Sequence, residues 1–291
     1  MAQKKVGSQG VRTHGQQRWR FVDTGPGDPF FNMALDEAIA QTVGAGAAPP
    51  TVRIYCWKPN AVSIGYAQRA LRVIDFQKCA RRGIPVVRRL TGGRTVLHGQ
   101  EVTYSVAALR SQWGSPASVL SIYQHIGRAL VAALRHLGID ARLSRSRRDM
   151  TGSPGGAGNS HPCFTSAGRY EVLAEGRKLV GSAQRWVGET VLQHGSLLLG
   201  QEHARLAELL PGRRESSGHG AARRLTEKTI SLNALLDRQV SHSEVSRALQ
   251  SGFGELLEGT LRPGRISSRE EKLARLLVSE RYGRLEWTLR T

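Results

Sequence analysis

The chain has 291 residues, and its 42 Lys and Arg against 23 Asp and Glu give a formal net charge of +19. With Gly counted and Tyr left out, its apolar content is about 49%, an ordinary globular value that excludes general disorder. No stretch approaches the roughly 18 apolar residues that span a bilayer, and the start lacks the apolar core of a secretory signal. We predict a cytoplasmic globular protein of one large or two small domains, with no membrane role.

The positive charge comes mostly from arginine and suggests an acidic partner. The arginines are scattered and no motif of a nucleic-acid-binding module accompanies them, so the sequence predicts no nucleic-acid partner. An acidic protein fits the charge as well. If arginine is abundant only because of genome base composition, the charge says little.

The first half of the chain begins with a polar segment, 1–17, for which we predict a flexible tail. From Asn32 the apolar residues recur with a period near 3.6, which predicts a short helix capped by Asn32 with Asp36 and Glu37 in its first turn. The alternating segments 51–57 and 61–66 then follow on either side of a Pro-Asn turn. They are typical of paired strands.

The next segments continue this alternation of strands and helices. A helix with Cys79 on its apolar side is predicted over 75–83, ending at Gly83, and strands are predicted over 84–89, 94–98 and 102–108. The longest helical pattern covers 115–138, with Ser115 or Ser118 as cap and Gly138 as stop. Its predicted core stripe is Leu120, Tyr123, Ile126, Leu130, Leu134 and Leu137.

The second half opens with a basic segment rich in Gly and Ser, 144–160, for which we predict a mobile loop. Strands at 170–174 and 177–187 are joined by Glu175-Gly176, a link that suits a hairpin turn, and a further strand is predicted over 191–199. A polar loop is predicted over 213–224, and helices over 241–257 and 267–283. This order indicates an α+β fold: a mixed central sheet flanked by helices, with a helical C-terminal extension.

Three segments carry residues suited to chemistry. Residues 88–106 place two arginines, two adjacent glycines and a histidine between strands, where backbone N–H groups can approach a ligand closely. Residues 161–164 put Cys163 next to a proline, and 175–184 carry Lys178 in a hairpin strand. Taken singly each has a plain structural explanation, such as a tight turn or a solubilising charge.

Together these segments resemble the octanoyltransferases of the biotin and lipoate protein ligase superfamily, specifically the single-chain, cysteine-dependent class. The resemblance covers nearly the whole chain. It is carried by the segments WRFVDTGPGDPFFNMALDEA, RRLTGGRTVLHGQEVTYSV, the Cys-Phe pair at 163–164, YEVLAEGRKLVGSAQRWVGETVLQHGSLLL and the closing YGRLEWTLR. It implies a mixed sheet flanked by helices and a tunnel for a medium-length acyl chain.

The resemblance also implies an activity. Such enzymes take octanoate from acyl carrier protein through a cysteine thioester and pass it to a lysine of a lipoyl domain. The glycine cleavage H protein and the E2 subunits of 2-oxoacid dehydrogenases are acceptors of this kind. Cys163 matches the family's nucleophile, and Lys178 matches the lysine that lowers the pKa of that thiol. No cofactor or metal is implied.

The residues themselves favour Cys163 over the other two thiols. The three cysteines are odd in number, far apart and never in a CxxC pair, which supports neither disulfides nor a zinc site. Cys56 and Cys79 lie on apolar faces and are expected to be inert core residues. A neighbouring ammonium such as that of Lys178 would favour the thiolate of Cys163.

Two histidines compete for the role of base. His161 lies too near Cys163 in an extended segment to fold back onto it easily, and His98 more plausibly orders the acyl-binding loop. By the resemblance, the carbonyl end of the tunnel or the entrance for the phosphopantetheine arm should be lined by Arg88, Arg89, Gly92, Gly93 and Arg94, and its opposite wall by Gly181, Ser182 and Ala183. Thr165 departs from the family, in which an acidic residue is common at this position.

The domain organisation that follows has three parts: a tail over 1–17, an acyltransferase domain over 18–258, and a helical extension over 259–291 packed on it.

Three alternatives for the function stay open. An ATP-dependent lipoate ligase is disfavoured because Arg94 stands where ligases usually show a third glycine, and because adenylate chemistry has no need of Cys163. An amidotransferase between two lipoyl domains would keep the thiol. A nonenzymatic regulator would need a DNA-binding domain, for which the residues before Trp19 are too few.

Overall fold

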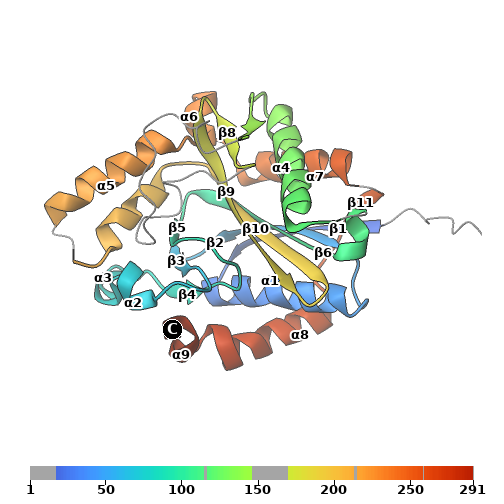
Figure 1. Ribbon diagram of the computed structural model, residues 1–291, viewed down its shortest axis with the longest axis horizontal. Helices are drawn as coiled ribbons and strands as arrows, with labels where there is room; N and C mark the ends of the chain where they lie inside the picture. The colour runs from blue at the N-terminus through green and yellow to red at the C-terminus, as the bar shows by residue number, and fades with distance from the viewer. Residues whose placement is uncertain (1–17, 115–116, 146–169, 213–214, 258, 291) are drawn as a thin grey trace, which may run out of the picture.

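The computed structural model describes residues 18–114, 117–145, 170–212, 215–257 and 259–290. Its centre is an eight-stranded sheet with helices on both faces, which confirms the predicted α+β class (Figure 1). The strand order is β11-β1-β2-β6-β10-β9-β8-β7. Strand β1 runs parallel to β2 and β11, while the other neighbouring pairs are antiparallel. The strands are β1 Arg18–Gly27, β2 Thr51–Trp57, β6 Glu101–Leu109, β7 Arg142–Leu143, β8 Val172–Ala174, β9 Arg177–Val187, β10 Thr190–Leu198 and β11 Thr260–Pro263.

A second, three-stranded sheet has the order β4-β3-β5, formed by β3 Ala61–Ile64, β4 Val86–Arg88 and β5 Val96–His98. The predicted pairing of segments 51–57 and 61–66 is therefore wrong. Strand β2 pairs with β1 and β6 in the large sheet, whereas β3 pairs with β4 and β5. Alternation along each segment identifies a strand, but it does not identify the neighbour.

The helices are α1 Pro29–Gly44, α2 Ala70–Val73, α3 Phe76–Arg81, α4 Val119–His136, α5 Glu215–Lys228, α6 Leu232–Leu236, α7 His242–Leu256, α8 Ser268–Leu277 and α9 Leu285–Leu289. Short 3₁₀ segments cover Arg110–Trp113 and Glu202–Leu209, and a π-helical turn covers Val278–Tyr282. In Figure 1, α1 and α8 lie on one side of the large sheet, and α4 and α7 lie on the other.

Helix α1 begins earlier than predicted. Its cap is Asp28, whose carboxylate accepts hydrogen bonds from the backbone of Phe30 and Phe31, and Pro29 occupies the first turn. This is the usual arrangement of an acidic cap followed by proline. Asp36 and Glu37 consequently lie in the middle of the helix, where both are buried, and not in its first turn.

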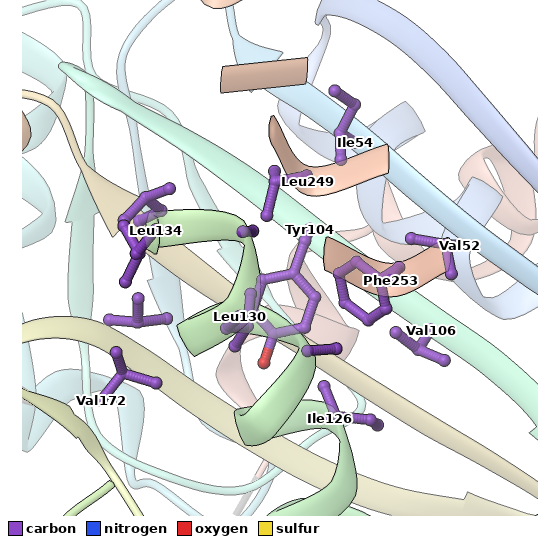
Figure 2. Packing of buried hydrophobic residues seen from close by; sticks show 14 of the residues in the cluster. Val52, Ile54, Tyr104, Val106, Ile126, Leu130, Leu134, Val172, Leu249 and Phe253 are labelled. Carbon is purple, nitrogen blue, oxygen red and sulfur yellow. The ribbon is translucent and has the colours of Figure 1, made fainter. Parts of the chain in front are cut away.

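Helix α4 is capped by Ser118, one of the two predicted caps, and Gly138 adopts the positive φ that ends it. Leu120 was predicted in its core stripe, but it lies in the first turn of the helix and its side chain is 44% exposed. The buried stripe packs against α7 and the large sheet (Figure 2). Gly252 of α7 permits this close approach, because a Cβ there would meet backbone atoms of Ala129 and Ala133.

The predicted polar loop over 213–224 is wrong, because α5 covers most of it. Ala221 and Leu225 of this helix are buried, and Leu225 packs with Leu198 and Ala204. Tertiary packing here overrides the low helix propensity of the local Gly and Ser residues.

The predicted hairpin between β8 and β9 is confirmed. Glu175 and Gly176 form its two-residue link with φ values of 50° and 70°, as a type I′ turn requires. The predicted mobile loop over 144–160 lies mostly outside the described residues, as does the N-terminal tail.

The chain after residue 259 begins with a strand before it becomes helical. Strand β11 covers the outer edge of β1, and α8 packs against α1. Arg20 of β1 reaches Glu270 of α8, with 2.9 Å between Arg20 Nη1 and Glu270 Oε2, and its Nε donates to Thr51 Oγ1 at 3.1 Å. The first strand of the sheet is thus tied to the last part of the chain.

Candidate active site

A cavity lies between the α1-side face of the large sheet and the small sheet. Five residues predicted for the substrate site line it: Arg89, His98, Gly181, Ser182 and Ala183. The sequence analysis did not select the rest of the lining, which is Met33, Tyr55, Trp57, Ser63, Val96, Thr103, His194, Gly195 and Ser196. The walls are mostly apolar, with a few polar groups, as suits an acyl chain that ends in a carbonyl.

Arg89 holds the glycine-containing loop beside this cavity. Its guanidinium donates to the carbonyl oxygens of Gly92 and Arg94 at 2.8 and 2.7 Å, and to Ser63 Oγ at 2.9 Å. Gly93 has a φ of +88°, and a Cβ there would lie 2.9 Å from the Arg89 guanidinium. The loop therefore needs glycine for its conformation and for its close approach to Arg89.

His98 is fixed at both ring nitrogens. Nδ1 lies 2.6 Å from Glu101 Oε1, and Nε2 lies 2.7 Å from Ser63 Oγ. The ring stacks on Trp57, with centroids 3.9 Å apart. Burial would raise the pKa of Glu101, but the contacts with His98 and the hydrogen bonds from Ser196 and Thr103 outweigh it, and the pKa is lowered. These contacts suit a histidine that orders the cavity wall.

A second buried carboxylate, Asp36, lies behind the cavity. Arg53 Nη1 pairs with its Oδ1 at 2.8 Å, and Ser105 Oγ donates to the same oxygen at 2.7 Å. Tyr55 donates to Oδ2 at 2.9 Å, and His194 Nδ1 lies 3.2 Å from it. Burial would raise the pKa of Asp36, but Arg53 and the His194 contacts outweigh it, so the carboxylate stays ionised.

His194 links this carboxylate to the glycine loop. Its Nε2 lies 2.5 Å from Thr91 Oγ1, so both ring nitrogens have partners. Burial lowers the pKa of His194, which keeps the ring neutral at physiological pH. The side chain thus presents an uncharged ring to the cavity.

A β-bulge sets the direction of Lys178. In the β8–β9 pair, Val172 lies opposite Val180, but the next residue, Leu173, lies opposite Lys178. Leu179 is therefore an extra residue, and two residues of β9 face one of β8. The bulge reverses the alternation, which places Lys178 on the sheet face opposite to Val180.

That face is the one on which Gly181 and Ala183 line the cavity. Lys178 is only 2% exposed, and its Nζ lies 3.0 Å from Oε1 of the buried Glu171. Lys178 is thus a buried, paired ammonium at the cavity side of the sheet and not an exposed solubilising charge.

Arg88, Gly92, Gly93 and Arg94 do not appear among the cavity-lining residues. Gly92 and Arg94 are held beside the cavity by hydrogen bonds from Arg89, which does line it. Arg88 is completely buried and its guanidinium donates to backbone carbonyls, among them those of Tyr66 and Thr288 at 2.7 and 2.8 Å. It connects two segments of the chain and does not face the cavity.

The predicted nucleophile, Cys163, lies outside the described residues, as do His161 and Thr165. The other two cysteines can be assessed. Burial raises the pKa of Cys56 to about 12 and that of Cys79 to about 11. Both stay thiols at neutral pH and are poor nucleophiles.

Asp36, Glu101, His194 and Trp57 were not predicted as site residues from the sequence. One signal was available for Asp36, since an Asp-Pro pair at 28–29 marks the helix start and moves Asp36 into its interior. The partners of the other three come from distant strands, so no local pattern identifies them.

In the described part of the chain, no group of three His, Cys, Asp or Glu side chains could hold a metal ion, and no helix there is long and apolar enough to cross a membrane.

The sequence that forms this sheet has counterparts among known proteins. A family model described as the lipoyl protein ligase A/B catalytic domain matches residues 28–254, and the chain belongs to this family. Among curated relatives, octanoyltransferase LipM of Kyrpidia tusciae is 42% identical over 94% of this chain and 99% of its own length. Octanoyltransferase LipM of Bacillus subtilis is 35% identical over 94% and 98%.

Solved structures agree with this placement. The bi-partite lipoate protein ligase from Thermoplasma acidophilum superposes with a TM-score of 0.75 at 27% identity, covering 94% of this chain and 96% of that one. A lipoate-protein ligase A bound with ATP gives a TM-score of 0.72 at 27% identity, covering 94% and 99%. The resemblance expected from the sequence is confirmed.

Proposed function

We propose that the chain transfers an octanoyl group to the lysine of a lipoyl domain through a thioester on Cys163. The cavity carries the proposal: its apolar walls suit an acyl chain, and a buried ammonium, Lys178, lies on the same sheet face. The octanoyltransferases LipM to which the chain is similar give the substrate class. The donor is octanoyl-acyl carrier protein, and the acceptors are proteins such as the glycine cleavage H protein or E2 subunits.

The reaction has two steps. The Cys163 thiolate attacks the carbonyl carbon of the octanoyl thioester, and the carrier's thiolate leaves as the enzyme thioester forms. The neutral amine of the acceptor lysine, having lost its proton, then attacks this thioester. An amide forms, the amine nitrogen releases one proton to solvent, and the Cys163 thiolate leaves, so neither ATP nor a redox partner is consumed.

Lys178 supports the first step in this proposal by favouring the thiolate. A nearby positive charge lowers the pKa of a thiol, and more thiolate is then present at neutral pH. The contact with Glu171 fixes the position of the Lys178 ammonium.

Intact-protein mass spectrometry after mixing with octanoyl-acyl carrier protein tests the thioester. We expect one added octanoyl group, labile to hydroxylamine, and its complete loss in Cys163→Ala. Cys79→Ala is the matched control, because that thiol is buried away from the cavity and should keep the adduct. An adduct that persists in Cys163→Ala would contradict the proposal, and octanoylation that requires ATP and free octanoate would indicate a ligase.

Alkylation of Cys163 by iodoacetamide against pH tests the role of Lys178. We expect the midpoint to move upward in Lys178→Ala, toward the free thiol value of about 8.5, because the stabilising charge is gone. Lys178→Arg keeps the charge and should keep the low midpoint. An unchanged profile in Lys178→Ala would remove Lys178 from the mechanism.

A further inference from the structure

Arg88 fastens the closing RLEWTLR segment to the loop that follows β3. Its guanidinium donates to the carbonyl oxygens of Thr288 and Arg290 in that segment at 2.8 and 2.7 Å. It also donates to the carbonyl oxygens of Tyr66 and Gln68 in the loop, at 2.7 and 2.8 Å. A completely buried side chain thus fixes Arg290 beside Tyr66.

Two guanidinium groups surround the Tyr66 ring as a result. That of Arg185, on β9, lies 3.8 Å from the ring centroid, and that of Arg290 lies 4.3 Å from it. Arg290 Nη2 also donates to the Tyr66 hydroxyl at 2.9 Å. All three side chains are partly exposed. Two like charges are therefore held at one phenol, on a part of the surface that solvent reaches.

The described residues supply no carboxylate that pairs with Arg88, Arg185 or Arg290, although neighbouring Arg281 pairs with Glu37. The positive potential shows in Tyr66, whose pKa is lowered by the neighbouring guanidinium groups of Arg185 and Arg290. Clustered cations without acidic partners attract an anion. Guanidinium groups match the oxygens of a phosphate group especially well.

The cluster adjoins the cavity. Arg185 is two residues beyond Ala183, so both lie on the same face of β9, and Arg185 Nη1 donates to the Leu90 carbonyl at 3.0 Å. The Tyr66 backbone N–H donates to the Thr91 carbonyl at 2.9 Å. Both contacts join the cluster to the segment just before the glycine loop. The cluster is thus connected directly to the wall of the cavity in which the acyl group would lie.

We propose that Arg185, Arg290 and Tyr66 form a binding site for the phosphate group on the arm of the acyl donor. This inference rests on the proposed function, because that function supplies a donor whose acyl group is carried on a phosphopantetheine arm. The closing segment then has a role that the cavity does not explain: it contributes one of the two cations.

Calorimetric titration of the full chain with 4′-phosphopantetheine and with pantetheine tests the site without any acyl transfer. These two probes differ only in the phosphate group. At fixed ionic strength we expect the phosphorylated probe to bind about tenfold tighter or more, because charge-assisted hydrogen bonds contribute at this level. The preference should fall close to one in Arg185→Gln/Arg290→Gln, and should be partly kept in Arg185→Lys/Arg290→Lys, which retains both charges. The Lys variant also controls for folding.

Arg128→Gln is the matched control, since Arg128 is an exposed arginine on α4 and should leave the preference intact. Equal binding of the two probes by the unmodified chain, or a preference that survives in the Gln double variant, would overturn the proposal. If inorganic phosphate bound as tightly as 4′-phosphopantetheine, the claim that the site recognises the arm of the acyl donor would be wrong. A chain that prefers the phosphorylated probe but forms no octanoyl thioester would refute the proposed function alone, and a thioester without the preference would refute the phosphate site alone.

Discussion

The two faces of the large sheet bury different chemistry along the same strands. On β2 and β6, Val52, Ile54 and Val106 point toward α4 and α7 and join an apolar core (Figure 2). The alternate residues, such as Arg53 and Ser105, point toward α1 and are equally buried but bonded to Asp36. Alternation of apolar and polar residues usually marks one buried and one solvated face. In this protein it separates an apolar packing face from a second buried face, called here the polar face, where the polar network around Asp36 lies among apolar residues that pack against α1.

The largest expected effect comes from breaking the polar face at its centre. Asp36→Ala leaves Arg53 buried without its partner, so we expect the free energy of unfolding to fall by about 3–5 kcal/mol. Asp36→Asn keeps the shape without the charge and should lose less. Urea denaturation monitored by circular dichroism measures both. A loss below about 1 kcal/mol in Asp36→Ala would show that the polar face contributes little to stability.

Acid should also lower the free energy of unfolding through the polar face. Burial lowers the pKa of His194 below its usual 6.5. As the pH falls, the unfolded chain therefore takes up a proton on His194 at a higher pH than the folded chain does, and the free energy of unfolding decreases below pH 6.5. The pKa values of Asp36 and Glu101 are lowered from 3.8 and 4.5, so their contribution is present above those values and is lost as the pH falls through the folded-state pKa values.

The urea midpoint measured from pH 7 to pH 3 should therefore decrease throughout, first through His194 and then through the carboxylates. Asp36→Asn should flatten the lower part of this curve. A midpoint independent of pH would contradict the assigned ionisation of the polar face.

The smallest effect is expected on the packing face. Ile126→Val removes one methylene group from the core between α4 and the sheet, which costs about 0.5–1.5 kcal/mol. Because no charge changes, the loss should be the same at every pH, in contrast to Asp36→Asn. A loss that varies with pH would indicate that the two faces are coupled.

Local sequence patterns predicted the helices, strands and turns of this fold better than they predicted which of these elements lie next to one another. The hairpin at Glu175-Gly176 and the ends of α4 were predicted correctly, because a turn or a cap depends on a few adjacent residues. The partner of β3 and the helical state of 215–228 depend on packing between distant segments, so they were missed. The residue types in a strand do not by themselves specify which other strand it pairs with.

The same limit applies to the site. Arg89, His98 and the Gly181–Ala183 segment were selected by resemblance and do line the cavity. Arg88, next to Arg89 on β4, points away to a segment 200 positions later in the chain, which the sequence could not indicate. The bulge at Leu179, which turns Lys178 toward the cavity side, likewise depends on its pairing with β8.

The short outer strands of the large sheet bear on self-association. Its outermost described strands, β11 and β7, have only four and two residues, and β11 ends in Pro263. A strand with few free N–H and C=O groups gives another molecule little backbone to pair with, and proline removes a donor. Strand β1 has ten residues and would offer a longer template, but β11 pairs with the first four of them, Arg18–Phe21. By occupying that part of the edge, β11 shortens the backbone that β1 leaves open to intermolecular β-sheet formation.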